Sequence, residues 1–421
     1  MNEIAKADIL VVGSGMAGMS AALEAAEAGY HVVLLEKEPF LGGRVAHMHR
    51  FFPKLCPPAC GLELYFRRIK TNPRISYYTQ AEVRHVDGRR GSFAVRVQLN
   101  PRYVSLENCT ACGDCVGVCP AKRVDDFNYG IGQTAAIYLP HLMAMPAKYV
   151  VDRAACPDKE CSKCVAACRY GAIDLDMNPK TLRLNVASIV LATGWDPYDI
   201  AKMSDLGFGR YQNVITNVMM ERLAAADGPT GGKIIRPSDG KEIGSVAFVQ
   251  CAGSRDENYL PYCSAVCCMA SLKQATYVRE RHPNARVSIY FMDVRSPGRY
   301  EDFYRKVAGD ELVSLKRGKV AKVQQDPVTG DLTILADDTM HGMKMKETVD
   351  LVVLATGTVP AAGKGPLPGV KLVYDQYGFA IADGVEGVHP AGVAKRPMDV
   401  ATSVRDGIGA ALRAIQDVVG G

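Results

Sequence analysis

The chain has 421 residues, of which 48% are hydrophobic and 23% charged, with a formal net charge of +5 and no basic runs. This predicts a soluble globular protein of two or three domains and argues against nucleic acid as a partner. No stretch approaches the roughly 18 uninterrupted apolar residues of a membrane-spanning helix, so no direct membrane span is expected. Eight of the fourteen cysteines fall in two clusters with metal-type spacing, which favours a reducing, cytoplasmic compartment.

The first predicted elements, over residues 7–38, are a strand, a glycine-rich turn, an alanine-rich helix and a second strand. The turn reads Gly13-Ser14-Gly15-Met16-Ala17-Gly18, and Glu36 ends the second strand. In a dinucleotide site the first glycine permits the tight turn, the second allows the pyrophosphate to approach the backbone, and the third allows the helix to pack closely against the strand. The acidic residue binds the ribose hydroxyl groups. A lone motif of this kind can be an ordinary turn, but the strand, helix and acid together predict dinucleotide binding.

Further glycine segments resemble the flavoproteins that contain two dinucleotide-binding domains, in which the first domain binds FAD. They are "EKEPFLGGR" and two "LATG" strand ends, although Gly357 in the second "LATG" is expected only to end its strand. The resemblance implies that Arg44 and Gly392 lie near the flavin. It also implies that the helix after "AGVAKRPMD" directs its positive N-terminus at the isoalloxazine and stabilises a reduced, anionic flavin. The expected cofactor-binding residues are Gly13, Ser14, Gly15, Met16, Ala17, Gly18, Glu36, Lys37, Gly42, Gly43, Arg44, Val83, Ala192, Thr193, Gly194, Gly392 and Met398.

A cysteine-rich block follows two segments of alternating polarity, 74–88 and 92–100, that predict a half-exposed antiparallel meander. Within it "RYVSLENC" and "KYVVDRAAC" read as an internal repeat, and "CTACGDCVGVCP" and "CPDKECSKCVAAC" carry four cysteines each. This spacing predicts two 4Fe-4S clusters, with each fourth cysteine crossing to the other cluster as in two-cluster ferredoxins. Zinc is the alternative, and the repeated pattern disfavours it. The expected ligands are Cys109, Cys112, Cys115 and Cys168 for one cluster, and Cys156, Cys161, Cys164 and Cys119 for the other.

The second half of the pattern departs from the ferredoxin spacing. Four residues separate Cys156 from Cys161, and Arg169 stands where a proline is usual. The longer gap changes the geometry of the site, and the charge of Arg169 tends to raise the reduction potential of a nearby cluster. We expect both changes to affect geometry and potential more than ligation.

A third group of cysteines follows the predicted strand "SVAFVQ". A pyridine-nucleotide disulfide reductase would carry a second glycine loop here, but only Gly253 is present, so NAD(P)H binding is not expected. The residues Cys251, Cys263, Cys267 and Cys268 instead form C-x11-C-x3-CC, which predicts a third 4Fe-4S cluster. The alternative is that some of them are buried structural cysteines.

Two further features remain open. Cys56 and Cys60 lie where disulfide reductases carry their redox thiols, so they are candidate redox thiols, although they can equally belong to a stiff loop or bind something in a partner. His47 and His49 follow Arg44, and we interpret them as polar loop residues. No hydrolase signature is evident, so the flavin is expected to be the redox centre and the clusters to conduct electrons.

These patterns predict an α/β protein with two Rossmann-like lobes and an inserted two-cluster ferredoxin-like domain. The strand "ASIVLATGW" resumes the first lobe after the cysteine block, so the block is an insertion. The expected bounds are 1–102, 179–243 and 351–421 for the FAD-binding domain, 103–178 for the insert, and 244–350 for the second Rossmann-like domain.

With these motifs, and with "CAGSRDENYLPYCSAVCCMASLK", the chain resembles the A subunit of heterodisulfide reductase along nearly its whole length. That family binds FAD and several 4Fe-4S clusters. Methanogen members have extra N- and C-terminal regions, and the shorter form most resembles the A subunit of the quinone-interacting membrane-bound oxidoreductase (Qmo) complex of sulfate-reducing bacteria.

The Qmo resemblance implies a cytoplasmic subunit, attached to the inner membrane through a second flavin and iron–sulfur subunit of the same family and a haem b membrane subunit. It would pass electrons between menaquinone and adenylylsulfate reductase in dissimilatory sulfate reduction. One alternative is a soluble heterodisulfide-reductase-type subunit that works with hydrogenase or formate dehydrogenase, with electron bifurcation at the flavin. Another is an NAD(P)H-dependent flavoprotein reductase.

Overall fold

The computed structural model describes residues 3–156 and 161–420, except for the side chains of 3–6. It contains two compact units, each described by itself below: one comprises the chain up to Trp195 and again from Pro360 onward, and the other comprises Asp196–Val359. The short strands β13 (Trp195–Pro197) and β21 (Thr358–Pro360) pair where the chain passes between the units. Among the described residues, no helix is both long and apolar enough to cross a membrane.

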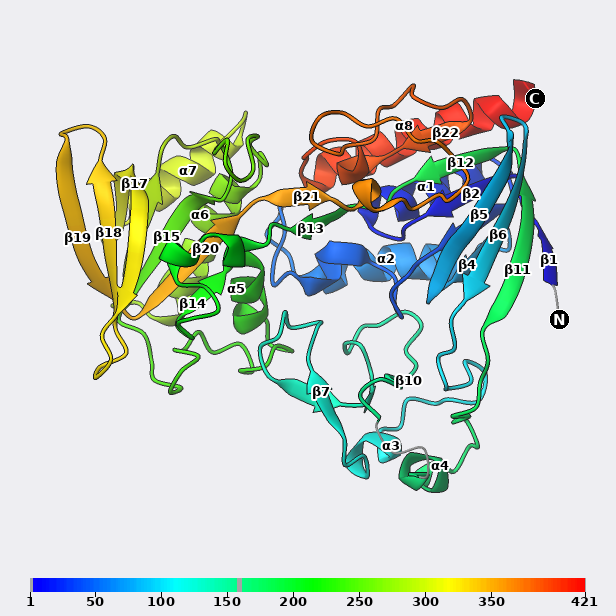
Figure 1. Ribbon diagram of the computed structural model, residues 1–421, viewed down its shortest axis with the longest axis horizontal. Coiled ribbons are helices and arrows are strands. Elements are labelled where there is room, and N and C mark those ends of the chain that lie inside the picture. The colour runs from blue at the N-terminus through cyan, green and yellow to red at the C-terminus, as the bar shows by residue number, and fades with distance from the viewer. Residues whose placement is uncertain (1–2, 157–160, 421) are drawn as a thin grey trace. The chain divides into compact units, whose positions relative to one another are not determined.

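The first unit is built on a parallel five-stranded sheet in the order β22-β12-β2-β3-β4 (Figure 1). The central strands β2 and β3 are entirely apolar because both faces of the sheet are covered. The strands are β2 (Ile9–Val12), β3 (Val32–Leu35), β4 (Ile75–Tyr78), β12 (Ser188–Leu191) and β22 (Val388–Pro390).

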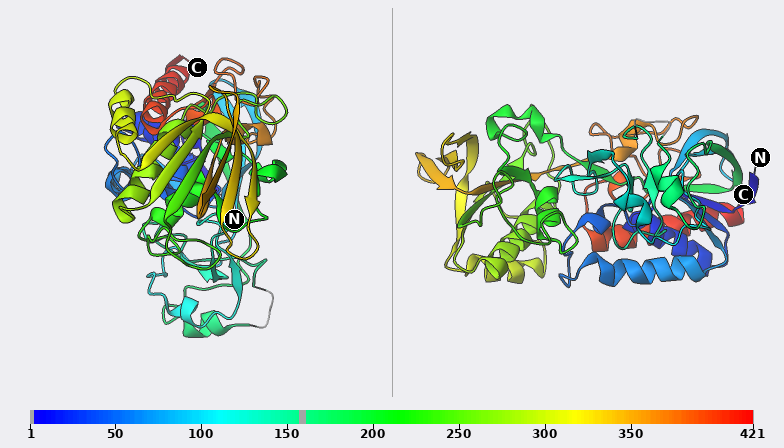
Figure 2. Two further views of the ribbon diagram at one scale, coloured as in Figure 1. Left: turned by 90° about the vertical axis from the view of Figure 1, so that its left-hand side faces the viewer. Right: turned by 90° about the horizontal axis from the view of Figure 1, so that it is seen from below.

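Helices cover one face of this sheet, and a second, mostly antiparallel sheet covers the other (Figure 2). Ile9 and Val11 of β2 belong to the core on the helical side, whereas Leu10 belongs to the core shared with the second sheet. That alternation is the two-residue period of a strand. The helices are α1 (Met16–Glu27), α2 (Pro58–Thr71) and α8 (Val400–Gly420), and the second sheet is β1 (Glu3–Lys6), β11 (Lys180–Val186), β6 (Ser92–Leu99) and β5 (Ala81–Arg89).

The insert, residues 103–178, also belongs to the first unit and contains only short elements. Val104 and Ile173 form an antiparallel bridge that closes its base, and both lie in its small core with several of the cysteines. The two cysteine segments repeat a backbone contact, since Cys109 N–H donates to the carbonyl of Ser105 and Cys156 N–H to that of Asp152, both at 3.1 Å. The elements are α3 (Asp114–Gly117), β7 (Lys122–Val124), β8 (Gln133–Ala135), β9 (Ile137–Tyr138), β10 (Val150–Val151) and α4 (Lys163–Ala167).

Arg102 anchors the insert to the flavoprotein-like part of the unit. Its buried guanidinium donates to the carbonyls of Tyr149 (2.8 Å) and Lys148 (2.6 Å) in the insert and to that of Pro39 (2.9 Å) after β3. Burial lowers the pKa of Arg102 to about 10. One buried side chain therefore holds three segments that lie far apart in the sequence.

We expect Arg102→Ala to destabilise the first unit, because it leaves buried carbonyl oxygens without a donor. A hydrogen bond to a charged group contributes about 1.5–3 kcal/mol, so the loss in the free energy of unfolding should reach roughly 3 kcal/mol or more. Urea denaturation of the holoprotein measures it. Arg84→Ala on β5 is the matched control, since Arg84 is half-exposed and pairs with the side chains of Glu82 and Gln98 at the surface. Equal losses in the two variants would contradict the anchoring role.

The second unit contains a seven-stranded mixed sheet in the order β14-β20-β15-β16-β17-β18-β19. The strands up to β17 are parallel, and β18 and β19 add an antiparallel hairpin at one edge. The strands are β14 (Val214–Thr216), β15 (Ser245–Ala252), β16 (Arg286–Phe291), β17 (Val313–Gln325), β18 (Leu332–Asp338), β19 (Met343–Val349) and β20 (Leu351–Thr356). The helices are α5 (Asn217–Ala224), α6 (Cys267–Arg281) and α7 (Tyr300–Ala308).

The boundaries of this unit differ from those expected from the sequence, which were 244 and 350. The structure places them at 196 and 359 because β14 and β20 are both strands of its sheet. Val214–Thr216 pairs with Val352–Leu354, and β20 pairs also with β15. Two segments that the apolar pattern assigned to the FAD-binding domain therefore complete the second sheet.

Candidate functional site

The glycine loop after β2 has the geometry of a dinucleotide site. Gly13 adopts φ +101°, and a Cβ atom there would overlap the carbonyl oxygen of Ala192. A Cβ on Gly18 would overlap the carbonyl oxygen of Gly13, whereas a Cβ on Gly15 would meet nothing within 4 Å. The first and third glycines are thus required by packing, and the second leaves open space beside the backbone, as a pyrophosphate requires.

Glu36 lies at the end of β3 with its carboxylate directed at this loop. Its Oε2 accepts from the backbone N–H (2.9 Å) and the hydroxyl (2.6 Å) of Ser14, and its Oε1 accepts from the N–H of Glu38 at 3.0 Å. The side chain is buried. The carboxylate is therefore held at the position from which a ribose diol is bound in this motif.

Three other predicted segments converge on the loop. A Cβ on Gly43 would lie 2.8 Å from Cα of Gly15, and one on Gly392 would lie 2.7 Å from Cβ of Ala17. Thr193, which follows Ala192 at the end of β12, has a buried hydroxyl with no hydrogen-bond partner in the described part of the chain. An unsatisfied buried hydroxyl beside an open backbone fits a polar ligand such as FAD. The loop residues Ser14, Met16 and Ala17 and the turn residues Gly42 and Gly194 lie in the same segments.

The other expected cofactor residues are distributed around this cradle. Arg44 donates to the carbonyl of Trp195 at 3.1 Å and lies over the rings of Trp195 and Tyr129, so it connects the glycine-rich turn with the insert. Lys37 is exposed, Val83 is buried in β5 opposite Val97, and Met398 is buried before α8. The α8 N-terminus is capped, since Asp399 Oδ1 accepts from Thr402 N–H at 2.7 Å.

The Asp399 cap weakens the positive end that α8 was expected to present to the flavin. A carboxylate at an N-terminus satisfies free N–H groups and offsets part of the helix dipole. Asp406, on the second turn of α8, also accepts from the N–H of Gly392 at 2.8 Å and pairs with Lys395. The positive end of α8 is therefore accompanied by two carboxylates that the sequence pattern did not reveal as neighbours.

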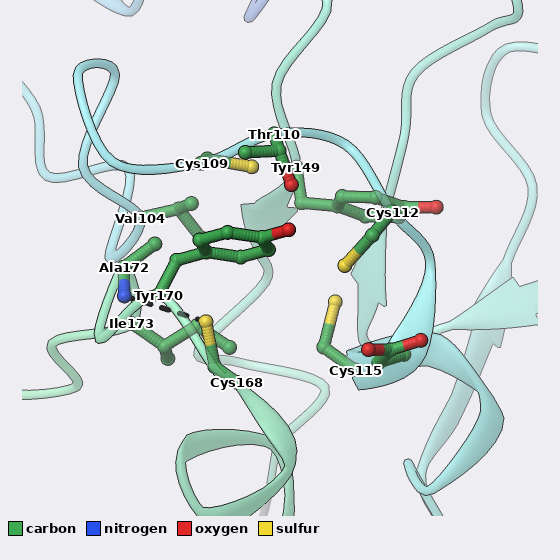
Figure 3. A pocket seen from close by; sticks show the side chains of 11 residues that line it. Val104, Cys109, Thr110, Cys112, Cys115, Tyr149, Cys168, Tyr170, Ala172 and Ile173 are labelled. Atoms are coloured by element: carbon green, nitrogen blue, oxygen red, sulfur yellow. Dashed lines mark hydrogen bonds between the residues drawn. The ribbon is translucent and has the colours of Figure 1, made fainter.

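In the insert, Cys109, Cys112, Cys115 and Cys168 line one cavity (Figure 3). The sulfur atoms of Cys112, Cys115 and Cys168 point into it, and the rings of Tyr149 and Tyr170 lie beside it. Burial raises the pKa of Cys115 to about 12, and the neighbouring thiols of Cys109 and Cys112 add to the increase. The fourth cysteine of the second motif thus lies with the first three of the first motif.

The remaining insert cysteines form the second group. Burial, together with Cys119 and Cys156, raises the pKa of Cys164, so the crossing neighbour Cys119 lies close to the second motif. Arg153 donates to the sulfur of Cys156 at 3.5 Å. Cys161 lies near α4, and residues 157–160, the longer gap, lie outside the described residues.

Arg169, which replaces the usual proline, pairs with Asp114 of α3 at 3.0 Å. Its charge is therefore countered by a carboxylate of the opposite repeat, and the pair joins the two halves of the insert. This reduces the increase in cluster potential that a lone cation would cause.

The donor chemistry in the insert fits iron–sulfur clusters better than a single ion. Among residues 3–156 and 161–420, no three histidine, cysteine or carboxylate side chains are grouped as a single metal ion requires. Zinc needs its ligands at about 2.0–2.3 Å, whereas a 4Fe-4S cluster binds each thiolate on a different iron. Burial raises the pKa of Cys115 and Cys164 and so favours their neutral thiols, and the positive charge of bound iron would favour the thiolates that a cluster requires.

The second unit brings Cys251, Cys263, Cys267 and Cys268 together. Cys251 is the penultimate residue of β15 and adopts φ +54°, and Cys267 and Cys268 begin α6. Burial raises the pKa of Cys267, and the other three thiols raise it further. Cys267 Sγ also donates to the carbonyl of Thr356 at 3.5 Å. All four thiols are therefore neighbours at the carboxyl ends of β15 and β20.

The turn after β15 differs from a dinucleotide loop. The helix begins only after residues 253–266, instead of directly after a glycine turn. A Cβ on Gly253 would lie 2.5 Å from the ring of Tyr198, so this glycine is covered by an aromatic side chain and faces no open space. Gly253 directly follows β15 as Gly13 follows β2, but two positions later this turn has Arg255 where the first loop has Gly15.

The two features that the sequence left open have different environments. Cys56 is partly buried in a loop and Cys60 is exposed in the first turn of α2, and both are free thiols. His47 is not simply a polar loop residue: its ring stacks on Phe127 of the insert at 4.2 Å, and its Nδ1 is 2.9 Å from the Phe127 carbonyl. Phe127 stacks in turn on His141 at 4.7 Å. Sequence reasoning missed this contact because Phe127 carries no motif.

Comparisons with known proteins agree with this geometry. The family model "FAD dependent oxidoreductase" matches residues 8–54, which include the glycine loop, Glu36 and the Gly42–Gly43 turn. Two thioredoxin reductases, from T. acidophilum and Lactococcus lactis, share the fold, with TM-scores of 0.55 and 0.54 at 16% and 13% identity. Each comparison covers 98% of this chain and 99% of the other.

Curated relatives extend the similarity to the cysteine segments. The chain is 38% identical to an A-type iron-sulfur subunit of the CoB–CoM heterodisulfide reductase of Methanopyrus kandleri, over 100% of this chain and 66% of the relative. It is also 38% identical to the A subunit of the H(2):CoB-CoM heterodisulfide,ferredoxin reductase of Methanothermobacter marburgensis, over 98% of this chain and 64% of the relative. The chain thus spans just under two thirds of the length of these relatives. Over almost its whole length, this chain is therefore similar to the A subunits of heterodisulfide reductases.

Proposed function

We propose that the chain is an electron-transfer subunit of a multi-subunit oxidoreductase that binds FAD and three 4Fe-4S clusters. One observation carries the proposal. The glycine-loop cradle and the cysteine-lined cavity belong to one compact unit, and Arg102, Arg44 and His47 contact both the insert and the rest of that unit. When bound, FAD supplies two-electron and one-electron exchange and the clusters supply one-electron exchange. The proposed ligands are the twelve cysteines expected from the sequence, namely Cys109, Cys112, Cys115, Cys119, Cys156, Cys161, Cys164, Cys168, Cys251, Cys263, Cys267 and Cys268.

The residues of the chain position these groups. Gly15 admits the pyrophosphate, Glu36 accepts from the ribose, and the Thr193 hydroxyl is available as a hydrogen-bond partner. Arg44 is held by Trp195 and Tyr129 between the glycine-rich turn and the insert, where its charge favours the more negative, reduced state of either neighbour. The chain therefore orients and electrostatically tunes its redox groups.

For the partners, we propose the Qmo-type assignment: electrons pass between a menaquinone-linked membrane subunit and adenylylsulfate reductase, with a second flavin and iron–sulfur subunit between them. The support is the resemblance of the motifs to the A subunit of that complex. The heterodisulfide-reductase-type alternative, with hydrogenase or formate dehydrogenase as partner, has equal support from the 38% identity to subunits of that type. In both assignments the chain works only together with partner subunits.

Anaerobic isolation of the native complex distinguishes these assignments. The Qmo-type assignment predicts co-purification of a b-type haem membrane subunit and a second flavin and cluster subunit, with haem bands in the visible spectrum. A haem-free assembly that contains a hydrogenase or formate dehydrogenase would replace it with the heterodisulfide-type function. Both results leave the electron-transfer role intact, whereas protein that retains neither flavin nor iron would overturn that role.

Neither NADH nor NADPH should bleach the flavin of the isolated, fully loaded protein. The reason is the covered Gly253, which leaves no approach for a second pyrophosphate. The measurement is the anaerobic absorbance of the flavin with a stoichiometric nicotinamide cofactor, and reduction by dithionite is the positive control. Bleaching by either cofactor within seconds would favour the NAD(P)H-dependent reductase instead.

A further inference from the structure

We propose that the ion pair between Arg255 and Asp293 sets the reduction potential of the cluster held by Cys251, Cys263, Cys267 and Cys268. The inference rests on the proposed third cluster and concerns positioning residues in its surroundings. The two charged residues come from separate loops, one after β15 and one after β16, and meet beside the cysteines.

Arg255 is in contact with the cluster-binding end of β15. Its guanidinium Nη1 pairs with Asp293 Oδ1. Burial raises the pKa of the Cys251 thiol, and the charge and hydrogen bonding of the neighbouring Arg255 side chain oppose that increase. The residue adopts φ +59°, and its N–H donates to the carbonyl of Tyr262 at 3.2 Å. A non-glycine residue in this region of φ is uncommon and is held there by its surroundings. The loop therefore holds the guanidinium beside one proposed ligand.

Asp293 is in contact with a second proposed ligand on α6. Its backbone carbonyl accepts from Cys268 Sγ at 3.8 Å, and its carboxylate also lies 3.6 Å from Nη2 of Arg295. The backbone N–H of Arg295 is hydrogen-bonded to the same Cys268 sulfur. The two residues of the ion pair thus lie beside two of the four proposed ligands, at the carboxyl ends of two neighbouring parallel strands.

The sign of each charge's effect follows from electrostatics. Reduction adds one negative charge to a cluster, so a nearby cation stabilises the reduced state and raises the potential, and a nearby anion lowers it. The side chain of Arg255 is 28% exposed and that of Asp293 is 47% exposed. Charges that are partly exposed are screened by solvent and salt but still act across a few ångströms. Arg255 and Asp293 should therefore shift the potential in opposite directions.

The experiment is a redox titration of the purified, cluster-loaded complex, monitored by electron paramagnetic resonance. The signal that Cys263→Ser removes identifies the third cluster. We expect Arg255→Gln to lower its potential and Asp293→Asn to raise it, each changing the ratio of reduced to oxidised cluster at fixed potential by about threefold to tenfold. Tenfold is about 59 mV for a one-electron couple. The double variant should return close to the wild-type value.

Two controls separate tuning from structural support. Arg305→Gln removes the same charge from an exposed pair with Glu301 on α7 and should leave the potential unchanged. Arg255→Lys keeps the charge and should stay within a few-fold of wild type, even if Arg255→Gln binds less iron. Shifts of the two single variants in the same direction, or no shift in variants with full cluster content, would overturn the proposal.

The iron content of the wild-type complex tests the third cluster itself. About twelve irons per chain correspond to three clusters and about eight to two. A value near eight would overturn the third cluster and the role of the ion pair together. A value near twelve with unshifted potentials would overturn the ion-pair proposal alone.

Discussion

Replacing Cys115 by serine is expected to remove at least one cluster, lowering the iron content from about twelve to about eight or fewer per chain. Cys115 is buried in α3, and its sulfur points into the cavity that Cys109, Cys112 and Cys168 also line. A serine hydroxyl is a poor ligand for iron in a site built from soft thiolates. The core of the insert is small and contains the cysteines themselves, so the loss should also lower its resistance to proteolysis.

The placement of Cys168 makes this prediction specific. Although Cys168 belongs to the second motif in the sequence, Cys168→Ser should remove the same electron paramagnetic resonance signal as Cys115→Ser. Cys119→Ser should instead match Cys164→Ser. Cys60→Ser is the control, because Cys60 is an exposed thiol on α2 outside all three groups. If Cys168→Ser affected the signal of Cys164→Ser, the crossed ligand sets would be wrong.

The second large effect concerns FAD binding. We expect substitutions of two glycines in the same loop, Gly15 and Gly18, to have different effects on flavin affinity and on stability. Gly15→Ala is expected to lower the affinity for flavin at least tenfold, while the fold is retained. Its Cβ meets no protein atom within 4 Å and instead occupies the space where the pyrophosphate approaches. Flavin content after reconstitution and the melting temperature of the flavin-free protein measure the two quantities separately.

Gly18→Ala should behave differently, because its Cβ overlaps the backbone of Gly13. Overpacking of this kind costs about 1–3 kcal/mol, so the flavin-free protein itself should be destabilised. Gly409→Ala is a matched control on α8, where a Cβ meets nothing within 4 Å. If the Gly15→Ala protein retained its flavin, the pyrophosphate would have to bind elsewhere, and the main support for the proposed FAD site would be lost.

Much of the candidate site was predictable because its chemistry is encoded in local spacing. The glycines of residues 13–18 and the acid at Glu36 lie within one strand–helix–strand unit, whose geometry is set by a few consecutive residues. The insert cysteines are predictable for the same reason, since the first three ligands of one cluster, Cys109, Cys112 and Cys115, are three residues apart from one another in turn. The boundaries of the second unit were not, because β14 and β20 look like generic apolar strands and only pairing decides which sheet they join.

By itself, the sequence determined the kinds of sites: a dinucleotide cradle, paired cysteine motifs and a cysteine run in place of a second glycine loop. Only the tertiary structure decided what surrounds them. It covers Gly253 with Tyr198, stacks His47 on Phe127, buries Arg102 between the insert and β3, and places Asp293 beside Arg255. These contacts join residues that are tens of positions apart. Local periodicity carries no information on such pairs, because strand order and loop packing bring them together only in the folded chain.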